Sequence, residues 1–500
     1  MKAKYFTLSL LAGLLLAATG CKNFLEQPVL GQYEAGQFFT SDANVVQAVN
    51  AAYVPLSFRD PASNVLWVLG DVASDDVVKG SNPGDQADFD NIQTFNITPI
   101  NSAVEAQWKR DYDGVFRCNV VLDGLPATNP SISPAVRAQA VGQAKFLRAW
   151  YYLQLTTIYG DIPLRLKVET PEELQSPARP QAQIFAQIET DCQEAAAALP
   201  PSWSGADLGR ATKGAALALL AKTYLYQQKW TLAAQTAQTV STLGYTLLPG
   251  FADNFRAATK NNAEAIFSVQ HTSGLSPGQG SGLNQWFAPR PQNGYGFYNP
   301  TRSLVRNYEA SPAGVLDPRL DYTIGRKGRD FFGVPYDTAW STTGYLSKKH
   351  LQPLSEIPAP IKGDGNLNFV ALRYAEVLLI QAEALNESGQ SAAARAPLNL
   401  VRQRARESYL NDKSLPGFGT VPAGLLPDIT TADQGALRDI IRRERRSELA
   451  TEFQRFFDLV RYGPAYATQA LRDKPNFNYA KNKFFPIPQS ERDTNKKLGI

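Results

Sequence analysis

The amino-acid sequence predicts a mainly α-helical protein whose helices form pairs and are interrupted by one large, loop-rich insertion. Apolar residues recur at steps of three and four over much of 37–244 and 368–500, which is the period of amphipathic helices. Two segments, 211–243 and 371–406, each hold two such helices joined by a short polar break. Residues 245–367 lack this period and are rich in turn-forming residues, so we expect an irregular region there.

The chain begins with an export signal. Two lysines precede an apolar run over residues 5–18, and small residues then lead to Cys21. A basic start, a short apolar run and small residues at a cleavage point define a secretory signal, and the run is shorter than the roughly 20 residues of a membrane span. The cysteine resembles that of the bacterial lipobox. We expect removal of residues 1–20, lipidation of Cys21 and a flexible tether over 21–36. An ordinary signal followed by a chance cysteine is the alternative.

The helices of the first half follow from their periodicity and their stop signals. Gly160 and Pro163 follow one of them, because glycine ends a helix readily and proline prevents its resumption. The expected helices are Asp42–Leu56, Asn101–Leu125, Ala135–Ile158 and Ile184–Leu199.

The segments 211–243 and 371–406 share a pattern of small residues. Their spacing is that of the tetratricopeptide repeat, a helix pair of about 34 residues in which small side chains let the helices cross closely. Any antiparallel helix pair in a large bundle is the alternative, since it needs similar small residues at its crossings. The matching small positions are Ala221 and Ala233 in the first segment and Ala382 and Ala394 in the second.

The last expected helix, Ala436–Arg461, separates an apolar face from a face that carries Glu444, Glu448, Glu452 and Arg455. Such dense charge is either a functional patch or a set of structural ion pairs with neighbouring helices. Ion pairs are the commoner explanation.

Composition limits the classes of function. The full chain carries a net charge of +4, two units of which belong to the export signal, so a nucleic-acid partner is not expected. Cys118 and Cys192 have no spacing typical of a metal site, and we expect free, buried thiols, although the sequence does not decide whether they pair. Two histidines exclude a multi-histidine metal centre. We expect no cofactor or metal, and no membrane attachment beyond the lipid.

Several motifs, taken together and in order, resemble the SusD/RagB family of nutrient-binding lipoproteins, which work beside TonB-dependent outer-membrane transporters in Bacteroidetes. The chain departs from the family's usual ending at residues 495–500. The resemblance implies one SusD-like domain over 37–500, with a tetratricopeptide-like scaffold, a ligand site formed partly by the irregular insertion, and a charged C-terminal helix that is scaffold. The matching segments are Cys21–Pro28, Tyr159–Leu164, Arg210–Lys213, Leu372–Leu379, Glu444–Leu449, Arg455–Arg461 and Phe485–Pro488.

Aromatic and polar residues of the insertion suit a carbohydrate ligand. A flat ring packs on the apolar face of a sugar, and nearby amides or guanidinium groups bond to its hydroxyls. For each ring, packing over the helical scaffold is the alternative. The candidate ligand contacts are Trp286, Tyr295, Tyr298, Trp340, Trp67, Asn284, Arg290 and Asn293.

An enzyme is an alternative class of function for this sequence. Residues 274–278 match the G-x-S-x-G nucleophile elbow, but proline and glycines follow the serine where the elbow needs a helix. A glycosidase needs two carboxylates, and acids of the first half are candidates for catalysis or calcium, with solvated loop acids as the alternative. These acids are Asp75, Asp76, Asp85, Asp88 and Asp90.

The sequence therefore predicts a non-catalytic protein, lipid-anchored on the outer face of the outer membrane. It would capture an oligosaccharide, or a peptide, and pass it to a SusC-like TonB-dependent transporter. The alternatives are a surface glycoside hydrolase and a helical-repeat scaffold that binds another protein and no small ligand.

Overall fold

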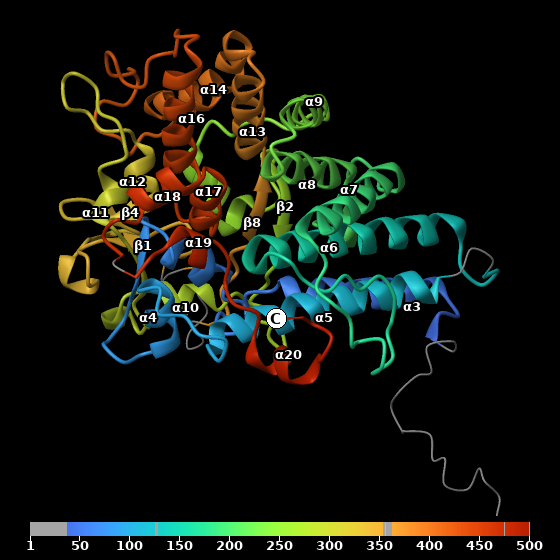
Figure 1. Ribbon diagram of the computed structural model, residues 1–500. Helices are drawn as coiled ribbons and strands as arrows, with labels where there is room; N and C mark the ends of the chain where they lie inside the picture. Colours follow the sequence, from blue (N-terminus) through green and yellow to red (C-terminus); the bar gives the residue numbers. More distant parts are fainter. Residues whose placement is uncertain (1–37, 126–128, 354–355, 357–362, 475, 500) are drawn as a thin grey trace, which may run out of the picture.

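A computed structural model describes residues 38–125, 129–353, 356, 363–474 and 476–499 (Figure 1). The expected export signal, Cys21 and the tether lie outside the described residues. The architecture is mainly helical, with a few short strands, which confirms the predicted fold class.

Helices of the scaffold begin and end close to the predicted positions. Side chains cap several of them: Asn101 accepts hydrogen bonds from the backbone N–H groups of Ala103 and Val104 at 3.1 and 3.2 Å, which fixes the start of α5. Gly160, with φ of 81°, ends α6 as expected. The scaffold elements are α3 (Asp42–Tyr53), η2 (Val54–Leu56), α4 (Ala87–Gln93), α5 (Ser102–Gly124), α6 (Pro134–Tyr159), α7 (Gln181–Ala198), α8 (Lys213–Tyr226), α9 (Trp230–Ser241), α13 (Tyr374–Glu387), α14 (Ser391–Arg406), α15 (Ser408–Asn411), α16 (Gln434–Glu448), α17 (Arg455–Arg461), α18 (Pro464–Ala470), α19 (Tyr479–Asn482) and α20 (Gln489–Thr494).

The two predicted helix pairs are present and lie next to each other. Helices α5 to α9 pack in sequence order, and α13 then packs on α9 and α14 on α13, although the insertion separates them in the chain (Figure 1). The matching alanines at 221, 233, 382 and 394 are fully buried. Small side chains at these positions therefore let the helices approach closely, as the tetratricopeptide pattern requires.

The insertion is irregular, as predicted, and most of it gathers at one end of the molecule beside β1 (Val77–Gly80) and α4, while α3 and α5 extend toward the other end (Figure 1). Its short elements are η5 (Phe251–Phe255), η6 (Ala257–Thr259), β2 (Ala265–Val269), α10 (Leu283–Phe287), η7 (Arg290–Gln292), β3 (Phe297–Pro300), α11 (Arg302–Val305), α12 (Arg319–Thr323), β4 (Ile324–Gly325), β5 (Asp330–Phe331), β6 (Val334–Pro335), η8 (Thr338–Trp340) and β7 (Leu346–Ser347).

One predicted helical segment, 371–406, does not begin as a helix. Residues Phe369–Arg373 form the strand β8, which pairs antiparallel with β2, and α13 starts only at Tyr374. The apolar run before Tyr374 fits a buried strand as well as a helix, because short runs of that kind do not separate the two by period alone.

The predicted C-terminal helix, Ala436–Arg461, is wrong as a single element. It breaks into α16 and α17, and Thr451 and Phe453 between them have φ of 62° and 65°. The carboxylate of Asp71 accepts hydrogen bonds from the backbone N–H groups of Phe453 and Arg455 at 2.9 and 3.1 Å and so holds the chain out of the helical path. Gly70 is required beside this turn, because a Cβ there would lie 2.0 Å from the Phe453 carbonyl oxygen.

The buried charges of α16 form structural ion pairs, as the sequence favoured. Glu448 is fully buried and pairs with Arg373 at 2.6 Å and with Arg319 at 2.8 Å. Such a network is stable only when each buried charge has partners. It joins the insertion, β8, α14 and α16, and it includes Glu264, Asp317, Arg319, Lys349, Arg373, Arg402, Arg404, Glu444, Glu448 and Glu452.

None of the helices in the described part of the chain combines the length and the apolar character needed to cross a bilayer.

Candidate functional site

A short two-stranded sheet brings the N-terminal half and the insertion together. Strand β1 (Val77–Gly80) pairs antiparallel with β3, with Gly80 opposite Phe297. The backbone N–H of Ser81 donates to the carbonyl of Gly296 at 2.7 Å, so the chain after β1 lies beside the chain before β3. Residues far apart in sequence thus share one surface.

A charged cluster lies on that surface. Nη2 of Arg290 lies 2.8 Å from Oγ of Ser81 and 2.5 Å from Oδ2 of Asp85. The hydrogen bond from Ser81 and the nearby Arg290 lower the pKa of Asp85 from its ordinary value. The side chains of Arg290 and Asp85 are 46% and 40% exposed, so the guanidinium and the carboxylate remain open to a ligand.

An exposed aromatic residue, Tyr295, directly precedes Gly296, the residue that bonds to Ser81 of the cluster. Tyr295 is 40% exposed and meets the half-buried Trp286 edge to face, with ring centroids 5.8 Å apart. Trp286 stacks on Phe297 at 5.0 Å, which fixes its plane. Asn293, exposed and with φ of 60°, forms the turn between Arg290 and Tyr295. We call the surface formed by Tyr295, Trp286, Arg290, Ser81 and Asp85 the Tyr295 face.

Three of the candidate contacts are buried, which corrects the expectation that they touch a ligand. Trp67 is 0% exposed and donates from Nε1 to the Pro61 carbonyl at 2.9 Å. Tyr298 is also 0% exposed and donates its hydroxyl hydrogen to Asp71. Asn284 accepts a hydrogen bond from the backbone N–H of Gln352 at 2.8 Å. These three side chains are packed inside the protein and expose no surface that a ligand could contact.

Trp340 lies in a separate aromatic group of the insertion. It is half-buried and packs against Phe331 and Tyr336, with ring centroids 5.7 and 5.5 Å away. The loop that follows is tied to β3, because Oδ1 of Asn299 accepts hydrogen bonds from both the backbone N–H and the hydroxyl of Thr342. Trp340 stays a prediction as a ligand contact.

The acids considered for catalysis or calcium are all engaged within the protein. Asp75 pairs with Arg455 at 2.9 Å, and Asp76 pairs with Arg446 at 2.7 Å. Asp88 accepts hydrogen bonds from the backbone and hydroxyl of Ser102 at the start of α5, Asp90 pairs with Lys79 at 2.6 Å, and Asp85 pairs with Arg290. Within the described ranges, no group of three or more potential metal ligands lies together.

The remaining elements of an enzyme site are also accounted for. The chain directly after Ser276 forms bends and two isolated bridges, at Gln279 and Ser281, and the next helix, α10, begins only at Leu283. Both histidines are buried, and desolvation lowers the pKa of His271 and of His350 to about 4, so both are neutral at pH 7.

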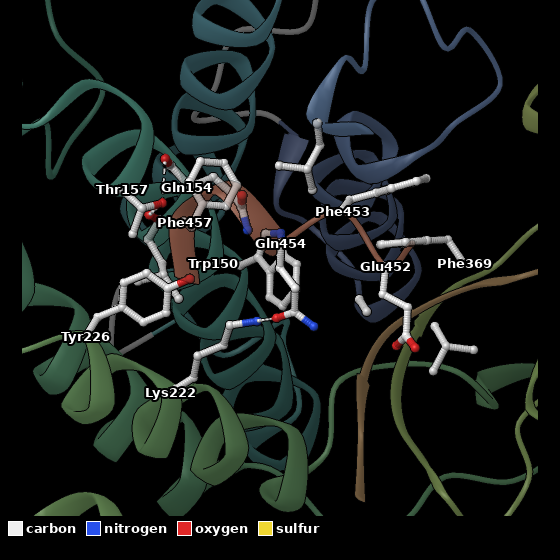
Figure 2. A pocket seen from close by; sticks show the side chains of 14 residues that line it. Trp150, Gln154, Thr157, Lys222, Tyr226, Phe369, Glu452, Phe453, Gln454 and Phe457 are labelled. Atoms are coloured by element: carbon white, nitrogen blue, oxygen red, sulfur yellow. Dashed lines mark hydrogen bonds between the residues drawn. The ribbon is translucent and has the colours of Figure 1, made fainter. Parts of the chain in front are cut away.

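An interior cavity of about 30 Å³ lies between α6, α8 and the turn after α16 (Figure 2). Nζ of Lys222 points toward Gln454, 3.1 Å from its Oε1, and also pairs with Glu376 at 3.0 Å. A cavity of this size holds about one water molecule, not a sugar. It belongs to the scaffold.

The fold is a helical scaffold with an irregular insertion, and the insertion contributes most of the Tyr295 face. Residues 263–499 match the model of the SusD family, and residues 21–225 match a model described as "Starch-binding associating with outer membrane". The chain belongs to the SusD/RagB family, whose glycan-binding members are non-catalytic.

Relatives match over nearly the whole chain. The SusD-like protein P2 of Formosa agariphila is 28% identical, and the match covers 97% of each chain. A solved structure titled "Laminarin binding SusD-like protein" is 27% identical, with a TM-score of 0.76 over 92% of this chain and 99% of that one. A SusD-like carbohydrate binding protein from Bacteroides fragilis is 26% identical, with a TM-score of 0.77 and the same coverage.

Sequence reasoning placed Trp286, Tyr295, Arg290 and Asn293 in one loop but missed their partners across the sheet. Asp85 was considered only as a catalytic or calcium-binding acid. The local signal for this strand is the β-branched pair at the start of Val77–Gly80. The strand is too short to be recognised from an alternating hydrophobic pattern.

Proposed function

We propose that the protein binds an oligosaccharide at the Tyr295 face without altering it. The observation that carries the proposal is that the exposed Tyr295 adjoins Gly296, whose carbonyl bonds to Ser81, and that Ser81 contacts the exposed Arg290 and Asp85. Sugars present apolar C–H faces and hydroxyl edges. A ring for the face and a charged donor and acceptor for the hydroxyls meet both needs.

The face is also held in place before a ligand arrives. Trp286 is fixed between Tyr295 and Phe297, and Arg290 is held by Ser81 and Asp85. Rigid contacts lose less conformational entropy on binding, so more of the contact energy appears as affinity. The solved relatives titled as laminarin binding and carbohydrate binding support a glycan as the ligand class.

We further infer that the ligand passes to a SusC-like TonB-dependent transporter while the protein is tethered by a lipid on Cys21. The match to the outer-membrane-associated family begins at residue 21, which supports maturation at that cysteine. A lipid and a flexible leader place the body near a channel without fixing its orientation.

Calorimetric titration of the mature chain with a panel of oligosaccharides tests the ligand. We expect saturable binding to at least one glycan, no released products, and a loss of about ten-fold or more in affinity for Tyr295→Ala, since stacking on an aromatic ring contributes on the order of 1–2 kcal/mol. Phe116→Ala is the matched control, because Phe116 is an exposed aromatic residue on α5, remote from the face in sequence and element.

Two outcomes contradict the proposal. Turnover of a bound glycan would identify a hydrolase, and binding of peptides alone would move the ligand to another class. Purification of the lipidated protein from its own membranes tests the partner, and failure to recover a TonB-dependent transporter with it would remove that part of the proposal.

A further inference from the structure

An open cleft of about 820 Å³ lies on the scaffold side of the turn formed by residues 57–64. The ends of α3 and η2, Arg110 of α5, the loop before α8 and the end of β2 line it. Sites for small ligands measure about 300–1,000 Å³. Tyr295 and Trp286 do not line this cleft, so it is distinct from the Tyr295 face.

The cleft carries an excess of positive charge. Arg59, Arg110 and Arg210 line it, against one carboxylate, Asp60. Asp207 neutralises Arg210, with Nε and Oδ1 2.6 Å apart. Across the part of the chain that the structure describes, neither Arg59 nor Arg110 forms an ion pair with a carboxylate.

Arg110 is half-buried and forms no direct ion pair, although Asp111, Asp60 and Asp113 act on its guanidinium from farther away. Its Nη2 donates to the carbonyl oxygen of Ser57, and no other hydrogen-bond acceptor meets the guanidinium among the described residues. Burial lowers its pKa from the ordinary value, yet an arginine stays protonated at neutral pH. A partly desolvated guanidinium with free N–H donors gains from an anion that contacts it directly. An oxyanion in the cleft would supply both the acceptor and the opposite charge.

The walls of the cleft suit the rest of a sugar. Val54 and Leu208 are 57% and 51% exposed and offer apolar surface to a C–H face. Asn50 lines the cleft and is exposed, so its amide can bond to the hydroxyls of a sugar. Tyr53 donates its hydroxyl hydrogen to Gln143 at 3.0 Å, and Arg210 donates to the same amide oxygen at 3.3 Å, which holds that wall in place.

We propose that this cleft binds an acidic sugar residue, so that the ligand of the protein is an anionic oligosaccharide. The shared chemistry is an oxyanion on a saccharide, either the carboxylate of a uronate or a sulfate ester, facing Arg59 and Arg110. A planar guanidinium fork recognises both groups through paired N–H donors. This inference rests on the proposed function and specifies its substrate class.

The cleft and the Tyr295 face lie on two sides of the same turn. The carbonyl of Ser57 contacts Arg110 on one side. On the other side, Phe58 accepts from the backbone N–H of Gly282 at 2.8 Å, and Pro61 accepts from Trp67, whose ring lies against Trp286.

Titration with oligosaccharides of equal length and different charge tests the inference. The probes are a neutral laminari-oligosaccharide, an oligogalacturonate and a sulfated galactan oligosaccharide. We expect the mature chain to prefer one acidic probe by about ten-fold or more, since a hydrogen bond to a charged group contributes about 1.5–3 kcal/mol. That preference should weaken as NaCl rises, because salt screens the contact. The acidic probe that binds more tightly identifies the carboxylate or the sulfate as the source.

Variants localise the effect. Arg59→Gln should remove most of the acidic preference and leave the affinity for a neutral chain within about two-fold. Arg110→Gln should also remove most of the acidic preference. If Arg110→Gln does not fold, the result for Arg59→Gln tests the inference. Arg302→Gln is the matched control, an exposed arginine on α11 that does not line the cleft.

The outcomes separate this inference from the proposed function. Equal affinity for acidic and neutral chains overturns the acidic ligand, and the proposed function still stands if Tyr295→Ala lowers affinity by about ten-fold or more. An acidic preference that survives Arg59→Gln but disappears in Arg290→Gln places the oxyanion at the Tyr295 face and overturns the cleft. Failure of every glycan to bind the unmodified protein ends both.

Discussion

Arg373 and Glu448 form an ion pair in the interior of the protein, with Nη1 2.6 Å from Oε1 and both side chains at most 1% exposed. Arg373 is the last residue of β8, and Glu448 is the last residue of α16. Arg373 also pairs with Glu264 at 3.0 Å. The pair therefore connects the β2–β8 sheet, in which β8 directly follows the insertion, to the end of α16.

Replacing Glu448 by Gln should destabilise the protein by about 3–5 kcal/mol, because it leaves the buried guanidinium groups without their counter-charge. Urea unfolding followed by circular dichroism measures the change. Glu105→Gln is the control, since Glu105 pairs with the exposed Lys109 one turn away on α5 and its loss should cost at most about 1 kcal/mol. Equal effects of the two changes would contradict a structural role for the buried network.

The stability of the protein should fall between about pH 4 and pH 7 through Asp111. Desolvation raises the pKa of this buried carboxyl from 3.8 to about 7 in the folded state. Between those values the unfolded chain ionises Asp111 while the folded chain keeps its proton, so stability decreases as the pH rises; above pH 7 the contribution stays constant.

Asp111→Asn removes this titration and keeps an oxygen for Gln107, which now donates to both carboxyl oxygens at 3.1 and 3.0 Å. Relative to the unmodified protein, the variant should gain up to about 4 kcal/mol between pH 4 and pH 7, at about 1.36 kcal/mol per pKa unit. Urea unfolding at both pH values measures the difference. Parallel pH profiles of the two proteins would show that Asp111 is ionised throughout.

Tyr298→Phe tests whether the buried tyrosine is part of the core. The change removes the hydroxyl that donates to Asp71, so the free energy of unfolding should fall by about 1–3 kcal/mol. Glycan affinity should stay within about two-fold. In contrast, Tyr295→Phe at the surface should leave stability within about 0.5 kcal/mol. A large loss of affinity in Tyr298→Phe would restore it as a ligand contact.

Sequence reasoning predicted the helices well where they depend on local signals. The caps of α5 and α6 and the alanines that let α8 and α9 cross are encoded within a few residues. The break between α16 and α17 could not be read in this way, because the carboxylate that causes it belongs to Asp71, more than 380 residues earlier in the chain.

The same distinction applies to the candidate site. The composition of the loop indicated Tyr295 and Trp286, but it could not separate them from Tyr298, which lies in the same run of residues. Tyr298 is buried because β3 pairs with β1 and turns its ring against Phe287, 4.4 Å away. The depth of a side chain is set by such pairing, which a local pattern does not contain.

Cys118 and Cys192 should behave as free, protected thiols. Both are buried and unpaired with each other, and burial raises the pKa of each thiol from its ordinary value. A thiolate is the reactive form, so a disulfide reagent should not label them in the folded protein. In guanidinium chloride both should react at once. A non-reducing mass that is two hydrogens lighter would instead indicate a disulfide.

Cys21→Ser should convert the protein from membrane-bound to released, if the lipid is its means of attachment. Two or more acyl chains hold a protein stably at about 0.8 kcal/mol per buried methylene, and serine provides no thiol to receive them. Fractionation of cells that express each form measures the shift from the membrane to the medium or periplasm, and Cys118→Ser is the control because that thiol is buried in α5. Protease treatment of intact cells then decides the face: digestion of the anchored form places the Tyr295 face outside the cell, whereas full protection places it in the periplasm and removes the route from an external glycan to the transporter.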